Sequence, residues 1–182
     1  MSEIKKWDIL DSQYIIKRPW LTARKDRVKL PNGQINDEFY VLEYPDWVNV
    51  IAVTEDGDFV MIEQYRHGLG RVQTEICAGV VESGERHLDA AKRELLEESG
   101  YGDGDWRLLT ILSGNPSTTN NLTYCYVAEG VRKISSQHLD RTEDVAVRLL
   151  SRDKVIELLR KDDMKQSLMV APLLRYLFMP ET

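Results

Sequence analysis

Hydrophobic and polar residues alternate in short runs along much of the chain, the pattern of half-buried strands. Before residue 46 these runs are broken by Pro19 and by the turn Pro31-Asn32-Gly33, which predicts a small antiparallel sheet. Beyond Pro45-Asp46 the runs are more apolar and predict core strands, namely Val48–Thr54, Phe59–Tyr65, Ile76–Val81, Trp106–Leu112, Leu122–Val127 and Val145–Leu150. We therefore expect a β subdomain over residues 1–46 and a main domain over residues 47–182.

Apolar residues at helical spacing predict two helices near the end of the chain. The first begins after Ser151, a good capping residue, and the second has Pro172 near its start. The side chains expected to face the core are Val155, Leu158 and Leu159 in the first, and Leu173, Leu174, Leu177 and Phe178 in the second.

An earlier helix has an acidic face. At about 100° per residue, Leu88, Ala91 and Leu95 fall on one side, and Glu94, Glu97 and Glu98 lie together on another. Like charges four residues apart cost roughly 0.2 to 0.5 kcal/mol. Periodicity alone leaves two interpretations open, a solvated acidic face or a cation site. A site made of carboxylates, without a His or Cys cluster, suits Mg²⁺ or Mn²⁺.

Composition limits the class of protein. The chain has 182 residues, 42% of them hydrophobic, enough for one core, and its net charge of −6 argues against nucleic acids and anionic membranes as partners. We see no secretory leader, and no apolar run approaches the ~20 residues of a membrane helix. Cys77 and Cys125 lie in apolar stretches, as buried thiols do. These features predict a cytoplasmic protein.

One segment matches a known signature. After Gly79 come five residues and Glu85, then seven residues and Arg93-Glu94-Leu95-x-Glu97-Glu98-x-Gly100-Tyr101. This closely resembles the signature of the Nudix hydrolases, with Tyr101 where an aliphatic residue is more usual. The resemblance implies an α/β (α+β) fold, an α/β/α sandwich around a mixed sheet, with the small N-terminal β subdomain added to it.

The resemblance also implies roles for the residues of this segment. Glu94 and Glu98 would bind Mg²⁺ or Mn²⁺, with Glu97 and the Ala78 carbonyl as further ligands. Arg93 would hold the carboxylates in place, through Glu85 or Glu97, and Arg93 and Glu97 would belong to the catalytic set. The implied reaction is Mg²⁺-dependent hydrolysis of a diphosphate bond.

Further segments resemble the ADP-ribose pyrophosphatases of this family. They are Gln64-Tyr65-Arg66, the entry Thr74-Glu75-Ile76-Cys77-Ala78-Gly79, where Cys77 replaces a frequent proline, and Pro116. Arg66 and Glu75 would then bind substrate, although Arg66 as a plain salt-bridge partner is an alternative. Glu43 lies where these relatives recognise adenine with an Arg-Glu pair, yet Leu42 replaces the arginine.

The resemblance to these enzymes also implies a glutamate general base on a loop after the signature. Glu143, just before the strand at Val145, is our candidate and Asp144 the second choice, the alternative being a solvated acidic loop. ADP-ribose is the leading substrate, giving AMP and ribose 5-phosphate. Two other interpretations stay open: hydrolysis of GDP-mannose or another nucleotide sugar, and a non-catalytic module that senses nucleotides.

The N-terminal sheet has two interpretations. It covers the core, or, as in relatives, it forms a homodimer and lends aromatic residues to the neighbouring active site, for which Tyr14, Trp20 and Tyr40 are candidates. Packing is the alternative for each of them. The three histidines, His67, His87 and His138, show no ligand spacing and are expected to be structural.

Overall fold

The structure is a computed structural model that describes residues 3–179 and consists of two compact units. The smaller unit contains the chain up to residue 45 together with residues 113–121. The larger unit contains residues 46–112 and the chain from residue 122 onward.

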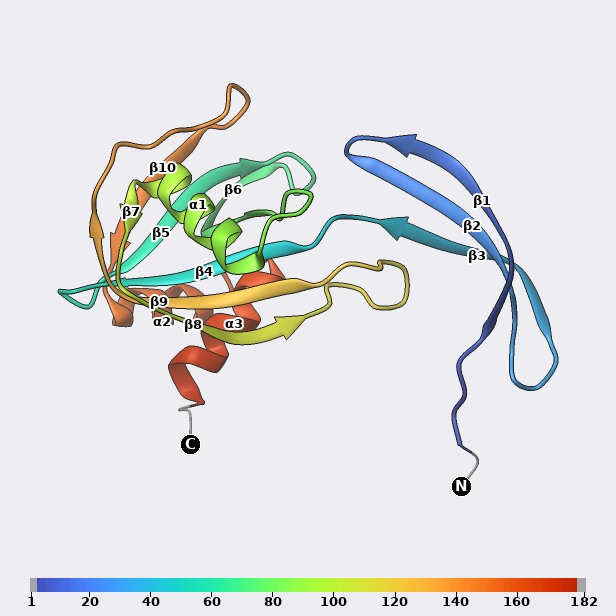
Figure 1. The fold of residues 1–182 in the computed structure, drawn as a ribbon. Coiled ribbons are helices and arrows are strands. Elements are labelled where there is room, and N and C mark those ends of the chain that lie inside the picture. The colour runs from blue at the N-terminus through green and yellow to red at the C-terminus, as the bar shows by residue number, and fades with distance from the viewer. Residues whose placement is uncertain (1–2, 180–182) are drawn as a thin grey trace. The chain divides into compact units, whose positions relative to one another are not determined.

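The smaller unit is a three-stranded antiparallel sheet. Its strands β1 (Asp8–Arg18), β2 (Leu21–Lys29) and β3 (Ile35–Glu43) lie in the order β1-β2-β3 (Figure 1). Gly33 turns the chain between β2 and β3 with a φ of 86°. The small antiparallel sheet expected from the sequence is therefore confirmed. All eleven residues of β1 are exposed, which leaves this strand largely without packing.

The larger unit is built on a mixed sheet in the order β10-β5-β6-β4-β9, with β7 and β8 also paired to β9. The β4–β9 pair is parallel and the other pairs are antiparallel. Its strands are β4 (Trp47–Thr54), β5 (Phe59–Arg66), β6 (Arg71–Val80), β7 (Tyr101–Gly102), β8 (Asp105–Leu112), β9 (Thr123–Lys133) and β10 (Val145–Leu150).

Strand β6 changes its partner half-way along. Residues 71–76 pair with β5, whereas residues 77–80 pair with β4. Each half of β6 therefore pairs with only one of these two strands, and the sheet opens on the other side of that half. The opening beside residues 71–76 matters for the cavity described below.

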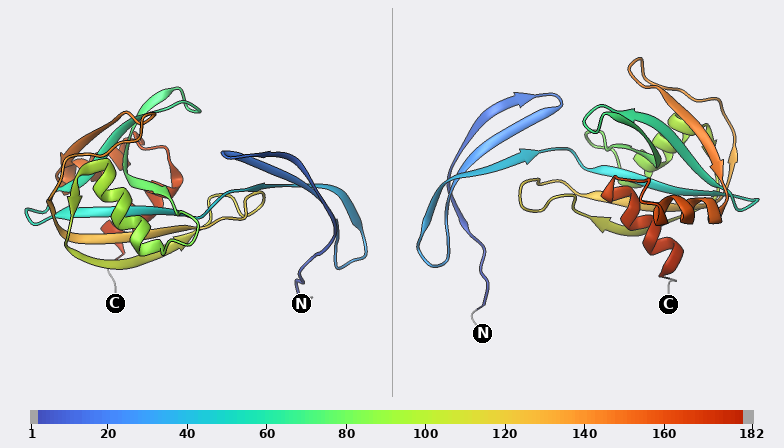
Figure 2. Two further views of the ribbon diagram at one scale, coloured as in Figure 1. Left: turned by 45° about the horizontal axis from the view of Figure 1, so that its top comes forward. Right: turned by 180° about the vertical axis from the view of Figure 1, so that it is seen from behind.

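Helices cover both faces of this sheet. Helix α1 (His87–Ser99) lies on one face, and α2 (Arg152–Arg160) and α3 (Ser167–Phe178) lie on the other (Figures 1 and 2). Strand β5 shows the resulting alternation: Val60 and Ile62 join the core under α1, and Phe59 and Met61 join the core under α2 and α3. The α/β/α sandwich is confirmed.

Some details differ from the sequence prediction. Strand β6 begins at Arg71 rather than at Ile76, because it buries polar Gln73 and Glu75, which break the apolar pattern. In α3, Leu173 and Leu177 are buried as expected, but Leu174 and Phe178 are 40% and 53% exposed. The prediction for these two was wrong, since Met169 and Pro172 complete the buried face of α3 instead. No helix within residues 3–179 is long and apolar enough to span a membrane.

Candidate active site

The second half of α1 presses two carboxylates against β6. Glu98 is only 5% exposed, and its Oε2 accepts a hydrogen bond of 2.9 Å from the backbone N–H of Ala78. The side chain of Glu94 is 13% exposed, whereas that of Glu97 is 41% exposed. Two of the three acidic residues therefore face the sheet, which rules out a simple solvated face.

Gly79 makes room for one of these carboxylates. A Cβ atom at position 79 would overlap the carboxylate of Glu94. The close approach of α1 to β6 thus requires glycine at this position. A second glycine of the signature ends the helix: Gly100 follows α1 with a φ of 76°, and its N–H donates to the carbonyl of Leu96.

Arg93 holds the acidic residues together. Its Nε and Nη2 donate to the two oxygens of Glu85 at 3.0 and 2.9 Å, and its Nη1 donates to Glu94 at 2.8 Å and to Glu97 at 3.1 Å. A further bond of 3.0 Å runs from Nη2 to the Val80 carbonyl. Only a guanidinium offers this many directed donors. The expected contact of Arg93 was with Glu85 or Glu97, and the structure shows both.

Burial, together with crowding, disfavours the charged forms of these carboxylates. The pKa of Glu98 is raised to about 8, mainly by burial and also by the charges of Glu94 and Glu143, while the Ala78 N–H and Arg66 oppose the rise. Burial also raises the pKa of Glu94, although Arg93 opposes this. The larger unit therefore brings Glu94, Glu98 and Glu143 into one electrostatic neighbourhood that a cation would stabilise.

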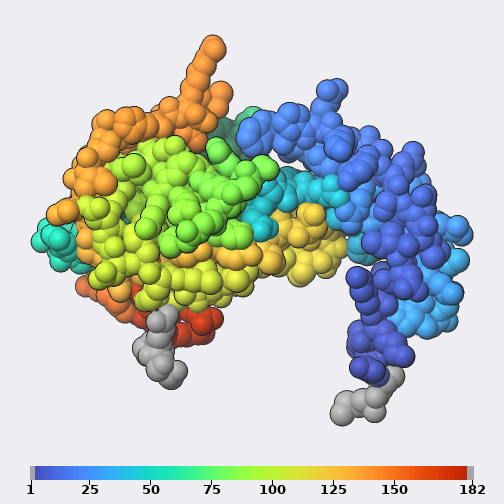
Figure 3. All heavy atoms as spheres, viewed as in Figure 1, coloured from blue at the N-terminus to red at the C-terminus, as the bar shows by residue number. Residues whose placement is uncertain are grey.

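Glu143 lies on an exposed segment between β9 and β10. This segment projects from the surface of the larger unit (orange in Figure 3), and the Glu143 carboxylate accepts a 2.9 Å hydrogen bond from the backbone N–H of Asp140. Asp144 is exposed beside it. Both candidates for a base are thus open to solvent, and Glu143 is the one whose charge acts on Glu94 and Glu98.

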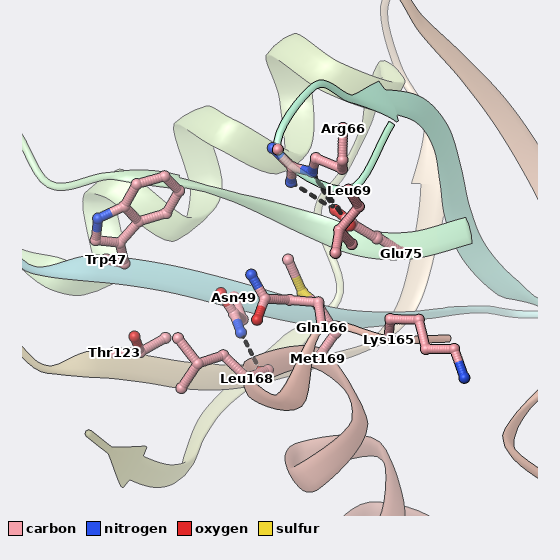
Figure 4. Close-up of a pocket in the computed structure, with 11 residues that line it drawn as sticks. Trp47, Asn49, Arg66, Leu69, Glu75, Thr123, Lys165, Gln166, Leu168 and Met169 are labelled. Carbon is pink, nitrogen blue, oxygen red and sulfur yellow. Dashed lines mark hydrogen bonds and ion pairs between the residues drawn. The ribbon is translucent and has the colours of Figure 1, made fainter. Parts of the chain in front are cut away.

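The two expected substrate residues of the larger unit contact each other. Arg66 Nη2 lies 2.5 Å from Glu75 Oε2, and the Glu75 side chain is only 2% exposed. Gln64 also approaches this carboxylate, at 3.5 Å. Arg66 therefore forms a salt bridge with buried Glu75. One third of the Arg66 side chain is exposed, on the edge of a cavity (Figure 4).

In the smaller unit, Glu43 has an arginine partner from another strand. Arg24 of β2 forms an ion pair with Glu43 and a second with Asp26. The Tyr14 hydroxyl donates to Glu43 at 3.2 Å. The arginine missing at position 42 is thus replaced in this contact by Arg24, which no motif in the sequence indicated. The other two aromatic candidates, Trp20 and Tyr40, are 82% and 48% exposed.

Two family models match this chain. The model described as "NUDIX domain" covers residues 44–171, and the one described as "Nucleoside diphosphate sugar hydrolase N-terminal domain" covers residues 7–42. The chain belongs to the Nudix hydrolase family. Its Nudix domain carries the paired carboxylates described above, and the second model falls on strands β1 to β3.

Relatives and a solved structure agree with this Nudix assignment. A methanol dehydrogenase activator from Bacillus methanolicus is 35% identical over 75% of this chain and 74% of its own length. An ADP-ribose pyrophosphatase from Bacillus subtilis (strain 168) is 32% identical over 72% and 71%. A crystal structure of an ADP compounds hydrolase has the same fold, with a TM-score of 0.83 at 23% identity over 95% of this chain and 93% of that one.

The Nudix carboxylates fit a magnesium ion better than a metal held by protein alone. Residues 3–179 contain no set of three or more His, Cys, Asp or Glu side chains already placed around one metal position. Mg²⁺ does not need such a set, since it commonly uses one or two carboxylates, several waters and phosphate oxygens of the substrate. The carboxylates of Glu94 and Glu98 are donors of the type that such a site uses.

The contact between Gly79 and Glu94 gives a first test. Gly79→Ala should lower the free energy of unfolding by about 1 to 3 kcal/mol, the usual cost of overpacking, because the new methyl group displaces the Glu94 carboxylate. In a Glu94→Ala background the same substitution should cost much less. Urea unfolding of the four proteins measures this coupling, and an equal cost in both backgrounds would contradict the close contact.

Proposed function

We propose that the protein hydrolyses the diphosphate bond of nucleoside diphosphate-linked sugars, with ADP-ribose as leading substrate and AMP and ribose 5-phosphate as products. The observation that carries this proposal is the pair Glu94 and Glu98, buried against β6 within the charge field of Glu143, in a Nudix domain. The N-terminal family model and the relative named ADP-ribose pyrophosphatase support the substrate class.

Nudix hydrolases generally require a divalent metal ion, and we propose Mg²⁺ here, with Mn²⁺ as a substitute. Glu94 and Glu98 would hold it, with Glu97 and the Ala78 carbonyl as further ligands. When bound, the ion supplies positive charge to the diphosphate oxygens as negative charge develops on them. Arg93 positions the carboxylates through the hydrogen bonds described above.

We assign Glu143 as the general base. It would take a proton from the attacking water while the water oxygen bonds to phosphorus. The bridging P–O bond breaks, and the leaving phosphate keeps its electron pair. The exposed segment that carries Glu143 leaves a water molecule room to reach the carboxylate.

Three further residues are proposed substrate contacts. Glu75 lies three residues before Ala78 on β6, and Arg66 on β5 pairs with the Glu75 carboxylate, where a diphosphate sugar would extend. Glu43 would contact the nucleobase, with Arg24 as the cation of the pair. This arrangement supports adenine, while GDP-mannose and other nucleotide sugars remain the alternative substrates.

The substrate proposal is tested by measuring the release of nucleoside monophosphate from each candidate substrate. We expect AMP release from ADP-ribose with Mg²⁺ and none with chelator, in a panel that includes GDP-mannose, UDP-glucose and NADH. A faster reaction with GDP-mannose would select the alternative substrate. Binding without turnover of any member would support the nucleotide-sensing module instead.

The metal proposal predicts a folded but inactive Glu98→Gln protein. Loss of one carboxylate charge at the ion should lower kcat/KM about 100-fold or more, because metal stabilisation of the transition state is worth several kcal/mol. Glu157→Gln, at a half-exposed position of α2, is the control and should keep the wild-type rate. Wild-type rates in Glu98→Gln would remove Glu98 from the metal site.

The base proposal predicts different effects at two adjacent residues. Glu143→Gln should lower kcat about 100-fold with little change in KM, since general-base catalysis contributes about 10²- to 10⁴-fold. Asp144→Asn should stay near the wild-type kcat. The reverse result, measured by steady-state kinetics at saturating Mg²⁺, would transfer the role to Asp144.

We also propose a homodimer formed through the smaller unit, to which Tyr14, Trp20 and Tyr40 would contribute aromatic contacts. Exposed Ile9, Ile15 and Ile16 on β1 support an interface there, since monomers seldom expose large apolar patches. Sedimentation should give about twice the 21.0 kDa of one chain, and Ile15→Lys should favour the monomer. A wild-type monomer at micromolar concentration would refute the dimer.

We infer that the protein is located in a reducing compartment, the cytoplasm. We also infer that its partner is a small-molecule substrate rather than a nucleic acid. The unpaired, buried thiols of Cys77 and Cys125 support the first inference. The net charge of −6 supports the second.

A further inference from the structure

A cavity of about 460 Å³ in the larger unit begins at the Arg66–Glu75 pair (Figure 4). Its walls come from β4, β6, β9 and the start of α3, on the side of β6 where residues 71–76 have no pairing with β4. The volume is in the usual range for small-molecule sites. Apart from Arg66 and Glu75, none of its lining residues belongs to the active-site set described above.

The charged groups around this cavity are already neutralised. Arg66 is paired with Glu75 at 2.5 Å, and Lys165 Nζ lies 2.5 Å from an oxygen of Asp162. A pocket built for an additional phosphate would offer cations that have no carboxylate partner. The pairing therefore favours a neutral polar ligand.

Two neutral polar side chains of the lining lack a protein partner. Within residues 3–179, neither the Thr123 hydroxyl nor the Gln166 side-chain amide makes a hydrogen bond, although Thr123 is only 2% exposed. Every fully enclosed polar side-chain atom in this part of the chain does have a partner. The Thr123 hydroxyl must therefore open onto the cavity, where it can bond a ligand.

Gln166 directly precedes α3, and two buried amides hold the backbone around it. Buried Asn49 donates from Nδ2 to the Leu168 carbonyl at 2.5 Å, and Oε1 of buried Gln73 accepts the N–H of Lys165 at 3.1 Å. These two amides fix the backbone on both sides of Gln166. A backbone that is already held in place leaves less to be ordered when a ligand binds.

The remaining wall is apolar. The indole of Trp47 lies on one side of the cavity, and Leu69, Leu168 and Met169 lie around the rest (Figure 4). A sugar ring presents C–H faces as well as hydroxyl groups, and an apolar, partly aromatic wall with a few neutral hydrogen-bonding groups suits both.

We propose that this cavity is the subsite for the sugar of the substrate, with Thr123 and Gln166 bonding its hydroxyl groups and Trp47 packing against its ring. This inference rests on the proposed function for its connection to catalysis. Glu75, on the cavity edge, lies three residues before Ala78 on β6, about 10 Å along an extended strand. A sugar in the cavity would therefore keep its diphosphate close to the carboxylates.

Matched substitutions test the two polar contacts. Thr123→Val and Gln166→Leu should each raise KM for ADP-ribose and the inhibition constant of ribose 5-phosphate about 3- to 10-fold, the effect of one lost neutral hydrogen bond. The kcat value and the inhibition constant of AMP should change little. Thr123→Ser, which keeps the hydroxyl, should recover most of the loss. Unchanged constants for ribose 5-phosphate in folded Thr123→Val and Gln166→Leu proteins would overturn the subsite.

A binding experiment separates this inference from the proposed function. In chelator-treated protein, ribose 5-phosphate should change tryptophan fluorescence, and Trp47→Phe should abolish the change while Trp106→Phe keeps it. An equal response to inorganic phosphate would overturn the sugar assignment in favour of an anion site. If no substrate is hydrolysed but the sugar response depends on Thr123, the proposed function fails and the subsite stands.

Discussion

The architecture of the candidate site depends on the contact between the α1 carboxylates and strand β6. Glu98 is buried from solvent and accepts a hydrogen bond from the backbone N–H of Ala78. Glu94 fits only because residue 79 has no side chain. Burying carboxylates in this way is unfavourable without compensation. Arg93 provides part of it through Glu85 and Glu94. The part of this cost that Arg93 leaves uncompensated favours a cation beside Glu94 and Glu98, in agreement with the proposed metal site.

The local chemistry of the signature explains why its part of the site could be predicted. Arg93 meets Glu85 and Glu97 because helix periodicity and a short loop bring them together, whatever the rest of the chain does. Glycine at positions 79 and 100 likewise has local reasons, a close approach and a left-handed helix end. The structural roles of such residues can therefore be predicted from the sequence around them.

The residues that could not be predicted come together through distant pairing. Thr123 reaches the cavity because β9 pairs in parallel with β4, opposite Trp47, and Gln166 arrives from the far end of the chain. Arg24 meets Glu43 across the β2–β3 pair, so a search for a neighbouring arginine at position 42 could not find it. The buried face of α3 could not be predicted either. Most of this helix is hydrophobic, so the sequence pattern does not distinguish exposed Leu174 from buried Leu173.

The change of partner in β6 has an evolutionary consequence. The half that contains Ala78 and Gly79 lies against the carboxylates of helix α1, whereas the half formed by residues 71–76 borders the cavity at Glu75. Substitutions in the second half, in β9 or at the start of α3 can reshape the cavity without moving the carboxylates. The fold therefore allows one bond-breaking centre to be inherited unchanged while descendants acquire new substrates.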